Sequence, residues 1–213
     1  MTLALSLGAC ATVPPLSPLP PLPERPAEEL EPLWQQHQQE IGRLTGWSLE
    51  GRIVVNTDDD GWNGELRWSQ SPRDYQIHFM APFGQGAFKL KGDEYGVEMR
   101  LSDGQVFRAP DAESLLMDHI GWHLPLKEFR YWVTGVPDTP DKGRKILNNS
   151  GQLAGFSQDQ WQITYPEYFT VGDVMMPRKV FFKNHALSVR LVIDRWVLKS
   201  GGNIRQQSYG ENP

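Results

Sequence analysis

Apolar and polar residues alternate with a period of two in many short segments of this 213-residue chain. In residues 49–55, for example, Leu49, Ile53 and Val55 share one parity, while Glu50 and Arg52 occupy the other. Successive side chains of a β-strand point to opposite faces of a sheet, so this alternation predicts strands with one buried face and one solvated face. A chain in which this pattern recurs has to fold around a sheet with one face buried and the other in contact with solvent.

The same alternation recurs in residues 62–68, 75–79, 88–91, 97–101, 161–165, 180–182 and 189–194. Turn signals such as Asp60-Gly61, Lys91-Gly92 and Asp103-Gly104 separate these segments at close intervals. Short strands joined by tight turns are typical of an antiparallel meander, whereas the long crossover helices of parallel sheets are missing from the pattern. The sequence therefore predicts a mainly β, α+β fold built on one curved antiparallel sheet.

Three segments carry a helical period instead. Residues 28–44 place Leu30, Leu33, Trp34 and Ile41 on one face, and residues 110–135 predict two further short helices separated near Pro125. These helices are the only elements that the pattern offers to cover the apolar face of the sheet. They either seal a packed core or lie over a cavity, and the residue pattern leaves both possibilities open.

The N-terminal segment has the features of an export signal and a tether. Leu7-Gly8-Ala9-Cys10 follows a short apolar run and resembles the lipobox of bacterial lipoproteins, in which the cysteine is lipidated. The resemblance implies export to the outer membrane, because Ala11 rather than Asp follows the cysteine. We interpret residues 1–9 as a shortened signal peptide and residues 10–27 as the lipidated cysteine with a proline-rich, semi-rigid tether. Residues 28–199 form the folded domain, and residues 200–213 are expected to be a disordered tail.

Composition and motifs favour a protein without catalytic activity. The net charge of −5 disfavours nucleic-acid binding, and the single cysteine rules out an internal disulfide. His119 and His123 stand four residues apart, but Gly121 interrupts the helix between them and the glutamate of a zinc protease motif is missing. Residues 84–89 (GQGAFK) begin like the glycine-rich loop of a dinucleotide-binding site, but Lys89 stands where that motif has its third glycine. We expect no enzyme, no cofactor and no metal site.

Several longer stretches together resemble the LolB family of outer-membrane lipoprotein receptors, which belongs to the lipoprotein localisation pathway of Gram-negative bacteria. They are GRIVV (51–55), LRWSQ (66–70), APFGQGAFKL (81–90), the segment 111–137 and LVIDRW (191–196). The resemblance implies an incomplete antiparallel β-barrel with a lid of about three α-helices over a hydrophobic cavity. It implies a monomer that takes acylated lipoproteins from a soluble periplasmic carrier and inserts them into the outer membrane.

The resemblance also implies two sets of site residues. The loop Pro82-Phe83-Gly84 is expected to insert its apolar tip into the membrane, although Phe83 packing against Met80 and Phe88 is the alternative. Strand parity and helix phase supply the candidate residues for the acyl-chain cavity, any of which can also be ordinary core. These are Leu49, Ile53, Leu66, Trp68, Ile77, Phe79, Leu90, Met99, Leu115, Phe129, Trp132, Ile163 and Leu191.

Two functions of other classes remain open from the sequence. The first is an envelope enzyme with a carboxylate pair assembled from distant residues. The second is a purely structural lipoprotein, which a solidly filled barrel would favour. An apolar hollow beneath the helices would favour the transport function instead.

Overall fold

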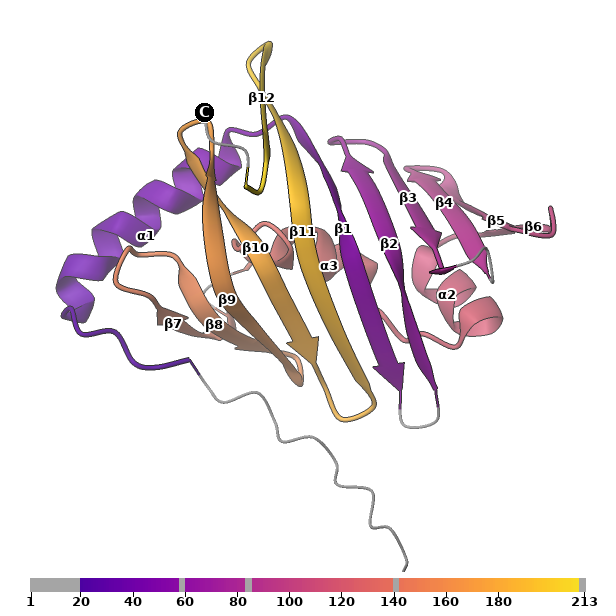
Figure 1. Cartoon of the computed structure of the whole chain (residues 1–213), viewed down its shortest axis with the longest axis horizontal. Coiled ribbons are helices and arrows are strands. Elements are labelled where there is room, and N and C mark those ends of the chain that lie inside the picture. The colour runs from indigo at the N-terminus through magenta and orange to yellow at the C-terminus, as the bar shows by residue number, and fades with distance from the viewer. Residues whose placement is uncertain (1–19, 58–59, 83–85, 140–141, 211–213) are drawn as a thin grey trace, which may run out of the picture.

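The computed structural model describes residues 20–57, 60–82, 86–139 and 142–210 (Figure 1). Within these residues the chain forms one twelve-stranded antiparallel sheet and three helices. The helices are α1 (Ala27–Gly42), α2 (Ala112–Ile120) and α3 (Leu126–Trp132). None of the helices in the described parts is long and apolar enough to cross a membrane. The predicted mainly β fold with three short helices is confirmed.

The sheet consists of two meanders joined at the middle. The first contains β1 (Gly46–Thr57), β2 (Gly61–Gln70), β3 (Tyr75–Met80), β4 (Ala87–Asp93), β5 (Gly96–Leu101) and β6 (Val106–Ala109). The second contains β7 (Arg144–Leu147), β8 (Leu153–Gln158), β9 (Trp161–Val171), β10 (Val174–Lys183) and β11 (Leu187–Ser200). The long strands β1 and β11 pair along their whole lengths and unite the two halves.

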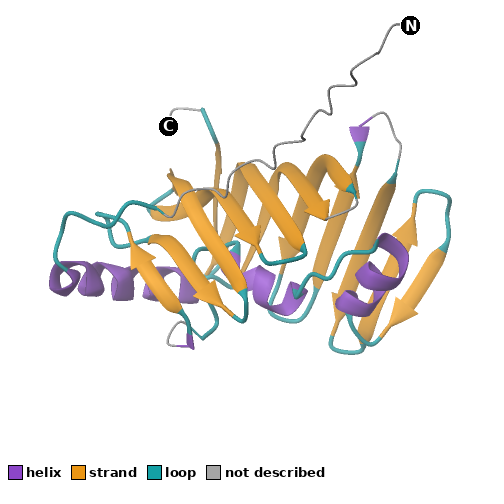
Figure 2. Ribbon diagram, turned by 90° about the horizontal axis from the view of Figure 1, so that it is seen from below, coloured by secondary structure: helices purple, strands orange, loops and turns teal. Residues whose placement is uncertain are grey.

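This strand order explains where the helices lie. The spatial order is β6-β5-β4-β3-β2-β1-β11-β10-β9-β8-β7, so the consecutive strands β6 and β7 occupy opposite edges of an open sheet. The segment that connects them must cross from one edge to the other, and it carries α2 and α3 over the inner face (Figures 1 and 2). The sequence pattern predicted these helices, but only the strand order shows why α2 and α3 lie over the inner face of the sheet.

The predicted parity of the strands agrees with their burial. In β1, Leu49, Ile53 and Val55 are buried, whereas Glu50, Arg52 and Val54 are exposed. The inner-face residues join α2 and α3 in one continuous hydrophobic core. Ion pairs such as Arg52 with Asp194 and Arg108 with Glu98 lie on the outer face.

Helix α1 covers the second half of the sheet from the side. Leu30, Trp34 and His37 are buried, and Glu31 pairs with Lys145 of β7 at 2.8 Å. The turn at Gly151 approaches α1 so closely that a Cβ there would collide with Leu33, and Gly151 also has a φ of +82°. Glycine is therefore required at this turn, because it alone combines that backbone conformation with the missing side chain.

The C-terminal segment differs from the prediction. Residues 203–208 form β12 (Asn203–Ser208), which pairs with Arg195–Ser200 of β11, so the expectation of disorder for residues 200–213 is wrong for this strand. Strand β10 pairs with β11 only as far as Val192, and β12 uses the edge that remains. A bulge leaves Asp194 outside the β1 pairing, and its carbonyl accepts a hydrogen bond from the Tyr209 amide at 2.7 Å. Residues 211–213 lie outside the described residues.

The end of the expected tether also contacts the domain. The Glu24 amide donates to Asn149 Oδ1 at 2.9 Å, and Arg25 Nη1 donates to the Asn149 carbonyl at 3.1 Å. Residues 20–23 line a surface pocket together with parts of β8 and β9. Residues 20–26 therefore belong to the folded body, while residues 1–19, including Cys10, lie outside the described residues.

Candidate functional site

The predicted acyl-chain residues all lie on the inner side of the molecule. Every one of the thirteen is buried, with exposed fractions between 0% and 8%, and all belong to the same core cluster. Leu49, Ile53, Leu66, Trp68, Ile77, Phe79, Leu90, Met99, Ile163 and Leu191 come from strands, and Leu115, Phe129 and Trp132 come from α2 and α3. Strand parity and helix phase therefore place these side chains on one apolar surface.

The two covering helices and the segment between them fill the concave face with aromatic side chains. Trp122, which follows α2, makes edge contacts with Phe79 at 5.7 Å and with Phe88 at 5.8 Å between ring centroids. In α3, Phe129 stacks on Phe182 of β10 at 4.3 Å. The Tyr165 hydroxyl donates a 2.9 Å hydrogen bond to the Trp132 carbonyl, which ties the end of α3 to β9.

The cover is thus held mainly by apolar packing, and its side chains occupy the space above the sheet. Trp122 is 3% exposed and Leu124 is 7% exposed, although both lie in a connecting segment outside the helices. Connecting segments usually lie on the surface, so two large apolar side chains buried from such a segment fix it against the apolar face of the sheet. The thirteen side chains pack against those of α2, α3 and the segment between these helices. An open cavity lined by the thirteen residues therefore stays a prediction.

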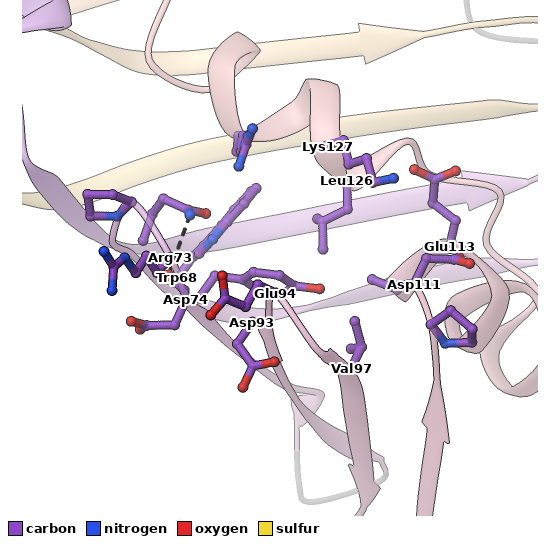
Figure 3. A pocket seen from close by; sticks show the side chains of 16 residues that line it. Trp68, Arg73, Asp74, Asp93, Glu94, Val97, Asp111, Glu113, Leu126 and Lys127 are labelled. Carbon is purple, nitrogen blue, oxygen red and sulfur yellow. Dashed lines mark hydrogen bonds between the residues drawn. The ribbon is translucent and has the colours of Figure 1, made fainter.

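A separate pocket of about 300 Å³ lies at one end of the sheet. The turns at 71–74 and 93–95, the start of α2 and the start of α3 surround it, and Trp68, Val97 and Leu126 supply apolar lining (Figure 3). Alternate turns of a meander fall at the same end of a sheet, which is why these distant segments meet. The sequence analysis did not predict this pocket. The available signal was that Asp74, Asp93 and Asp111 lie in alternate connections of the meander, which meet at the same end of the sheet.

Carboxylates dominate the charge of this pocket. Burial raises the pKa of Glu113, and the nearby carboxylates of Glu128 and Asp111 raise it further. Burial, with smaller contributions from Asp111 and Glu113, raises the pKa of Tyr75 to about 12. The pKa of Asp111 is lowered because its carboxylate caps α2 and accepts a 2.8 Å hydrogen bond from the Ser114 amide. The pocket is therefore a poor environment for a further negative charge.

The histidines considered as metal ligands have another arrangement. His119 stacks on Phe107 of β6 with ring centroids 3.7 Å apart, and Gly121 ends α2 in a left-handed conformation with a φ of 78°. Within the described residues there is no group of three or more His, Cys, Asp or Glu side chains that could hold a metal ion.

The expected membrane loop joins β3 to β4 at the end of the sheet opposite the 300 Å³ pocket. Ala81 donates its amide to the Gly86 carbonyl at 2.8 Å and so closes the base of the loop, and Pro82 is exposed. Met80 and Ala87 are the last paired residues before the loop. Phe83 and Gly84 lie outside the described residues, so insertion of Phe83 into a membrane stays a prediction.

Comparison with known proteins gives consistent results over most of the chain. Residues 45–196 match the family model described as outer membrane lipoprotein LolB. The outer-membrane lipoprotein LolB of Nitrosococcus oceani is 35% identical over 167 residues, which cover 78% of this chain and 83% of that protein. The LolB proteins of Pseudomonas syringae and Pseudomonas aeruginosa are each 32% identical over 163 residues, covering 76% of this chain and 80% of each relative.

Solved structures resemble this chain more distantly. A DUF1329 family protein from Desulfovibrio piger gives a TM-score of 0.48 at 8% identity and covers 88% of this chain and 95% of its own. A LolA superfamily protein from Nitrosomonas europaea gives a TM-score of 0.46 at 6% identity, covering 86% of this chain and 94% of its own. The sequence matches alone are sufficient for the assignment, and from them the chain belongs to the LolB family of outer-membrane lipoproteins.

Proposed function

We propose that this protein accepts acylated lipoproteins from a soluble periplasmic carrier and inserts them into the outer membrane. Membership of the LolB family supports the proposal, together with the apolar inner face that α2, α3 and Trp122 cover. In this proposal Cys10 is lipidated and anchors the protein at the periplasmic face of the outer membrane, and the protein acts as a monomer without catalysis or a cofactor.

The acyl chains need an apolar site during transfer. Exposing one long acyl chain to water costs on the order of 10 kcal/mol, at about 0.8 kcal/mol per CH₂ group. Lifting Trp122 and Leu124 out of the core exposes two apolar side chains, at about 1.5–3 kcal/mol for the leucine and more for the larger tryptophan. An acyl chain that fills the vacated space offsets the cost of opening, and the net free energy then depends on how well the carrier holds the same chain.

Transfer then proceeds towards the more favourable site. The carrier, this protein and the bilayer form a series in which each site must hold the acyl chains better than the preceding one, because a ligand shifts an equilibrium only through differential affinity. The membrane is the final acceptor in this series. No nucleotide or covalent step is required.

A photo-crosslinking amino acid at Phe79 tests the proposal. Phe79 is 1% exposed on the inner face of β3 and contacts Trp122, so acyl chains beneath the cover should pass next to it. We expect a crosslink to the acylated cargo when the carrier–cargo complex is mixed with the full chain. The same amino acid at Val54, which is 37% exposed on the outer face of β1, is the matched control and should give no crosslink.

The filled interior favours one second candidate, a purely structural outer-membrane lipoprotein. For that function the core has no reason to open, and neither position should crosslink to cargo. Absence of a crosslink at Phe79, with a folded variant and a functional carrier, would therefore support the structural function and contradict transport.

A further inference from the structure

The outer face of the sheet, which is turned away from α2 and α3, carries a row of basic side chains across four neighbouring strands (Figure 1). Strand pairing places Arg67 of β2 opposite His78 of β3, and His78 opposite Lys89 of β4. Lys89 in turn lies opposite Arg100 of β5. We call these four residues the basic row. Directly opposite side chains are neighbours, with Cβ atoms about 4.5–5.5 Å apart, and like charges in such positions destabilise a sheet. The stability of the fold therefore gives no reason for this row.

Carboxylates on the outer face neutralise only one end of the basic row. Glu98 lies 3.5 Å from Arg100, but it also lies 2.6 Å from Arg108 and is shared between the two guanidinium groups. Arg67 and Lys89 form no ion pair in the part of the chain that the structure describes. The middle of the row therefore keeps its positive charge.

The charges around His78 indicate the same positive potential. Burial lowers the pKa of His78, and the charges of Lys89 and Arg67 lower it further because they oppose protonation. Glu50 stands opposite Arg67 in the pairing of β1 with β2, but it contacts Arg195 at 3.9 Å. The whole chain has a net charge of −5, so this positive region is a local separation of charge on one face.

A groove of about 560 Å³ lies over the basic row, and Lys91 adds a further cation to its wall. Its lining is charged or polar apart from four buried residues of the inner face, which are Leu49, Trp68, Ile77 and Leu90. Specific protein interfaces depend on aromatic and apolar anchors, whereas a surface of anionic lipids attracts clustered Lys and Arg side chains without such anchors. The composition of the groove therefore favours a lipid surface over a protein partner.

The basic row lies close to the loop that joins β3 to β4. His78 is two residues before Met80, and Lys89 is two residues after Ala87, where Met80 and Ala87 are the last paired residues before the loop. Two residues of a strand span about 7 Å, which is less than the Debye length of about 8 Å at physiological ionic strength. A loop that enters a bilayer therefore brings the row within electrostatic reach of the lipid phosphates.

We propose that the basic row and Lys91 form a docking surface for the phosphate groups of anionic lipids, beside the loop that inserts into the membrane. The inference rests on the proposed function and adds an electrostatic contact that acts together with the loop. With the outer face towards the bilayer, α2 and α3 face away from the membrane. This is the side from which a soluble carrier approaches.

Vesicle sedimentation tests the docking surface. The full chain with Cys10→Ala is used, because this change removes the lipid attachment that would hold every variant on the vesicles. Binding to phosphatidylcholine vesicles with about one third phosphatidylglycerol should be about tenfold tighter than binding to phosphatidylcholine alone at about 0.1 M salt. The preference should disappear at about 0.5 M salt, because the charges are then screened.

Variants assign the preference to the basic row. Arg67→Gln combined with Lys89→Gln should lose most of the preference for anionic vesicles and keep its stability in urea, because it removes charges that have no partner in the fold. Arg43→Gln combined with Arg73→Gln is the matched control. Both control residues are exposed at the end of the sheet opposite the loop, and the net charge changes by the same amount. The control should keep the preference of the parent chain.

A fluorophore reports which face meets the bilayer. Cys10 is the only cysteine of the chain, so Gln76→Cys and Met117→Cys can each be labelled singly in the Cys10→Ala background. Gln76 lines the groove, and Met117 is 52% exposed on α2. On addition of anionic vesicles, the emission of an environment-sensitive dye should shift to the blue at Gln76 and stay unchanged at Met117.

The outcomes separate this proposal from the transport function, which the crosslink at Phe79 decides independently. Equal binding to both vesicle types, an unchanged preference in Arg67→Gln with Lys89→Gln, or a blue shift at Met117 alone would overturn the docking surface. Normal vesicle binding by that double variant with loss of the Phe79 crosslink would assign the row to the carrier protein instead. Release from vesicles by inorganic phosphate, but not by chloride at equal ionic strength, would assign it to a soluble phosphate ligand. Either assignment overturns the lipid contact.

Discussion

His37 is a histidine that the fold holds in an apolar environment. It is 4% exposed on the inner side of α1, with Trp34 at 6.2 Å and Tyr168 at 6.4 Å between ring centroids. Its Nε2 atom has no hydrogen-bond partner. Burial lowers the pKa of His37 to about 4, although the carboxylate of Glu40 opposes the shift. The neutral imidazole is therefore the form that the folded state accepts.

This histidine makes stability depend on pH. Between pH 6.5 and pH 4 the unfolded chain binds a proton at His37 that the folded chain does not bind, so the free energy of unfolding falls as the pH falls through this range. The loss should reach about 3 kcal/mol, since one pKa unit corresponds to about 1.4 kcal/mol. Urea denaturation at several pH values measures it.

His37→Leu isolates the contribution of this residue. The variant lacks the titrating group, so its stability should change less between pH 6.5 and pH 4 than that of the wild type. If both chains lose the same stability over this interval, His37 is not the source of the pH dependence.

At the scale of elements, β12 shows how a polar segment acquires structure. Asn203–Ser208 contains Ile204 as its only large apolar residue, and that side chain is 68% exposed. The strand forms because the second half of β11 would otherwise present an unpaired edge. Tyr209 then packs beside Phe169, and the Arg178 guanidinium lies 3.4 Å from its ring centroid.

Truncation after Ser200 tests the role of β12. Removal of β12 and Tyr209 should lower the free energy of unfolding by at least about 2 kcal/mol, because several backbone hydrogen bonds and the Tyr209 contacts disappear. The exposed edge of β11 should also promote self-association, which analytical ultracentrifugation detects. A chain that lacks only residues 211–213 is the control. Unchanged stability and a monomeric truncated chain would show that β12 contributes nothing to the fold.

Other elements differ in how well their sequence predicted them. The period of two located inner strands such as β1 and β3, because each has one solvated face and one apolar face. Strand β8 escaped this reasoning, since four of its residues in succession are buried and no alternation is visible. The four-residue edge strands β6 and β7 were also missed, because they are too short for a period to emerge.

At the scale of the whole molecule, the pocket and the β3–β4 connection lie at opposite ends of the sheet. The 300 Å³ pocket with its carboxylates lies at one end, and the loop between Met80 and Ala87 lies at the other. In the proposed function, insertion of this loop into the bilayer would keep the pocket on the side away from the membrane.

The loop end gives a prediction for membrane insertion. Phe83→Glu should preserve the fold and cargo uptake but lower cargo deposition into vesicles by about tenfold or more, because burial of a phenylalanine is worth about 1.5–3 kcal/mol and a carboxylate resists it. Phe83→Leu, which keeps an apolar tip, should retain deposition. Deposition at the wild-type rate by Phe83→Glu would remove the loop from the mechanism.

The sequence by itself determined which residues of the alternating strands face inwards, which segments form the three helices and which family the chain resembles. These properties follow from local periods and motifs, because the apolar face of a strand or helix is set by its own sequence and not by the elements packed against it. Only the tertiary structure decided that β6 and β7 lie at opposite edges, that Trp122 fills the concave face and that β12 pairs with β11. It also decided that two turns and the first residues of α2 and α3 enclose a pocket around Trp68. Each of these depends on segments far apart in the chain meeting in space, and the parity of a strand carries no information about what its inner face will meet.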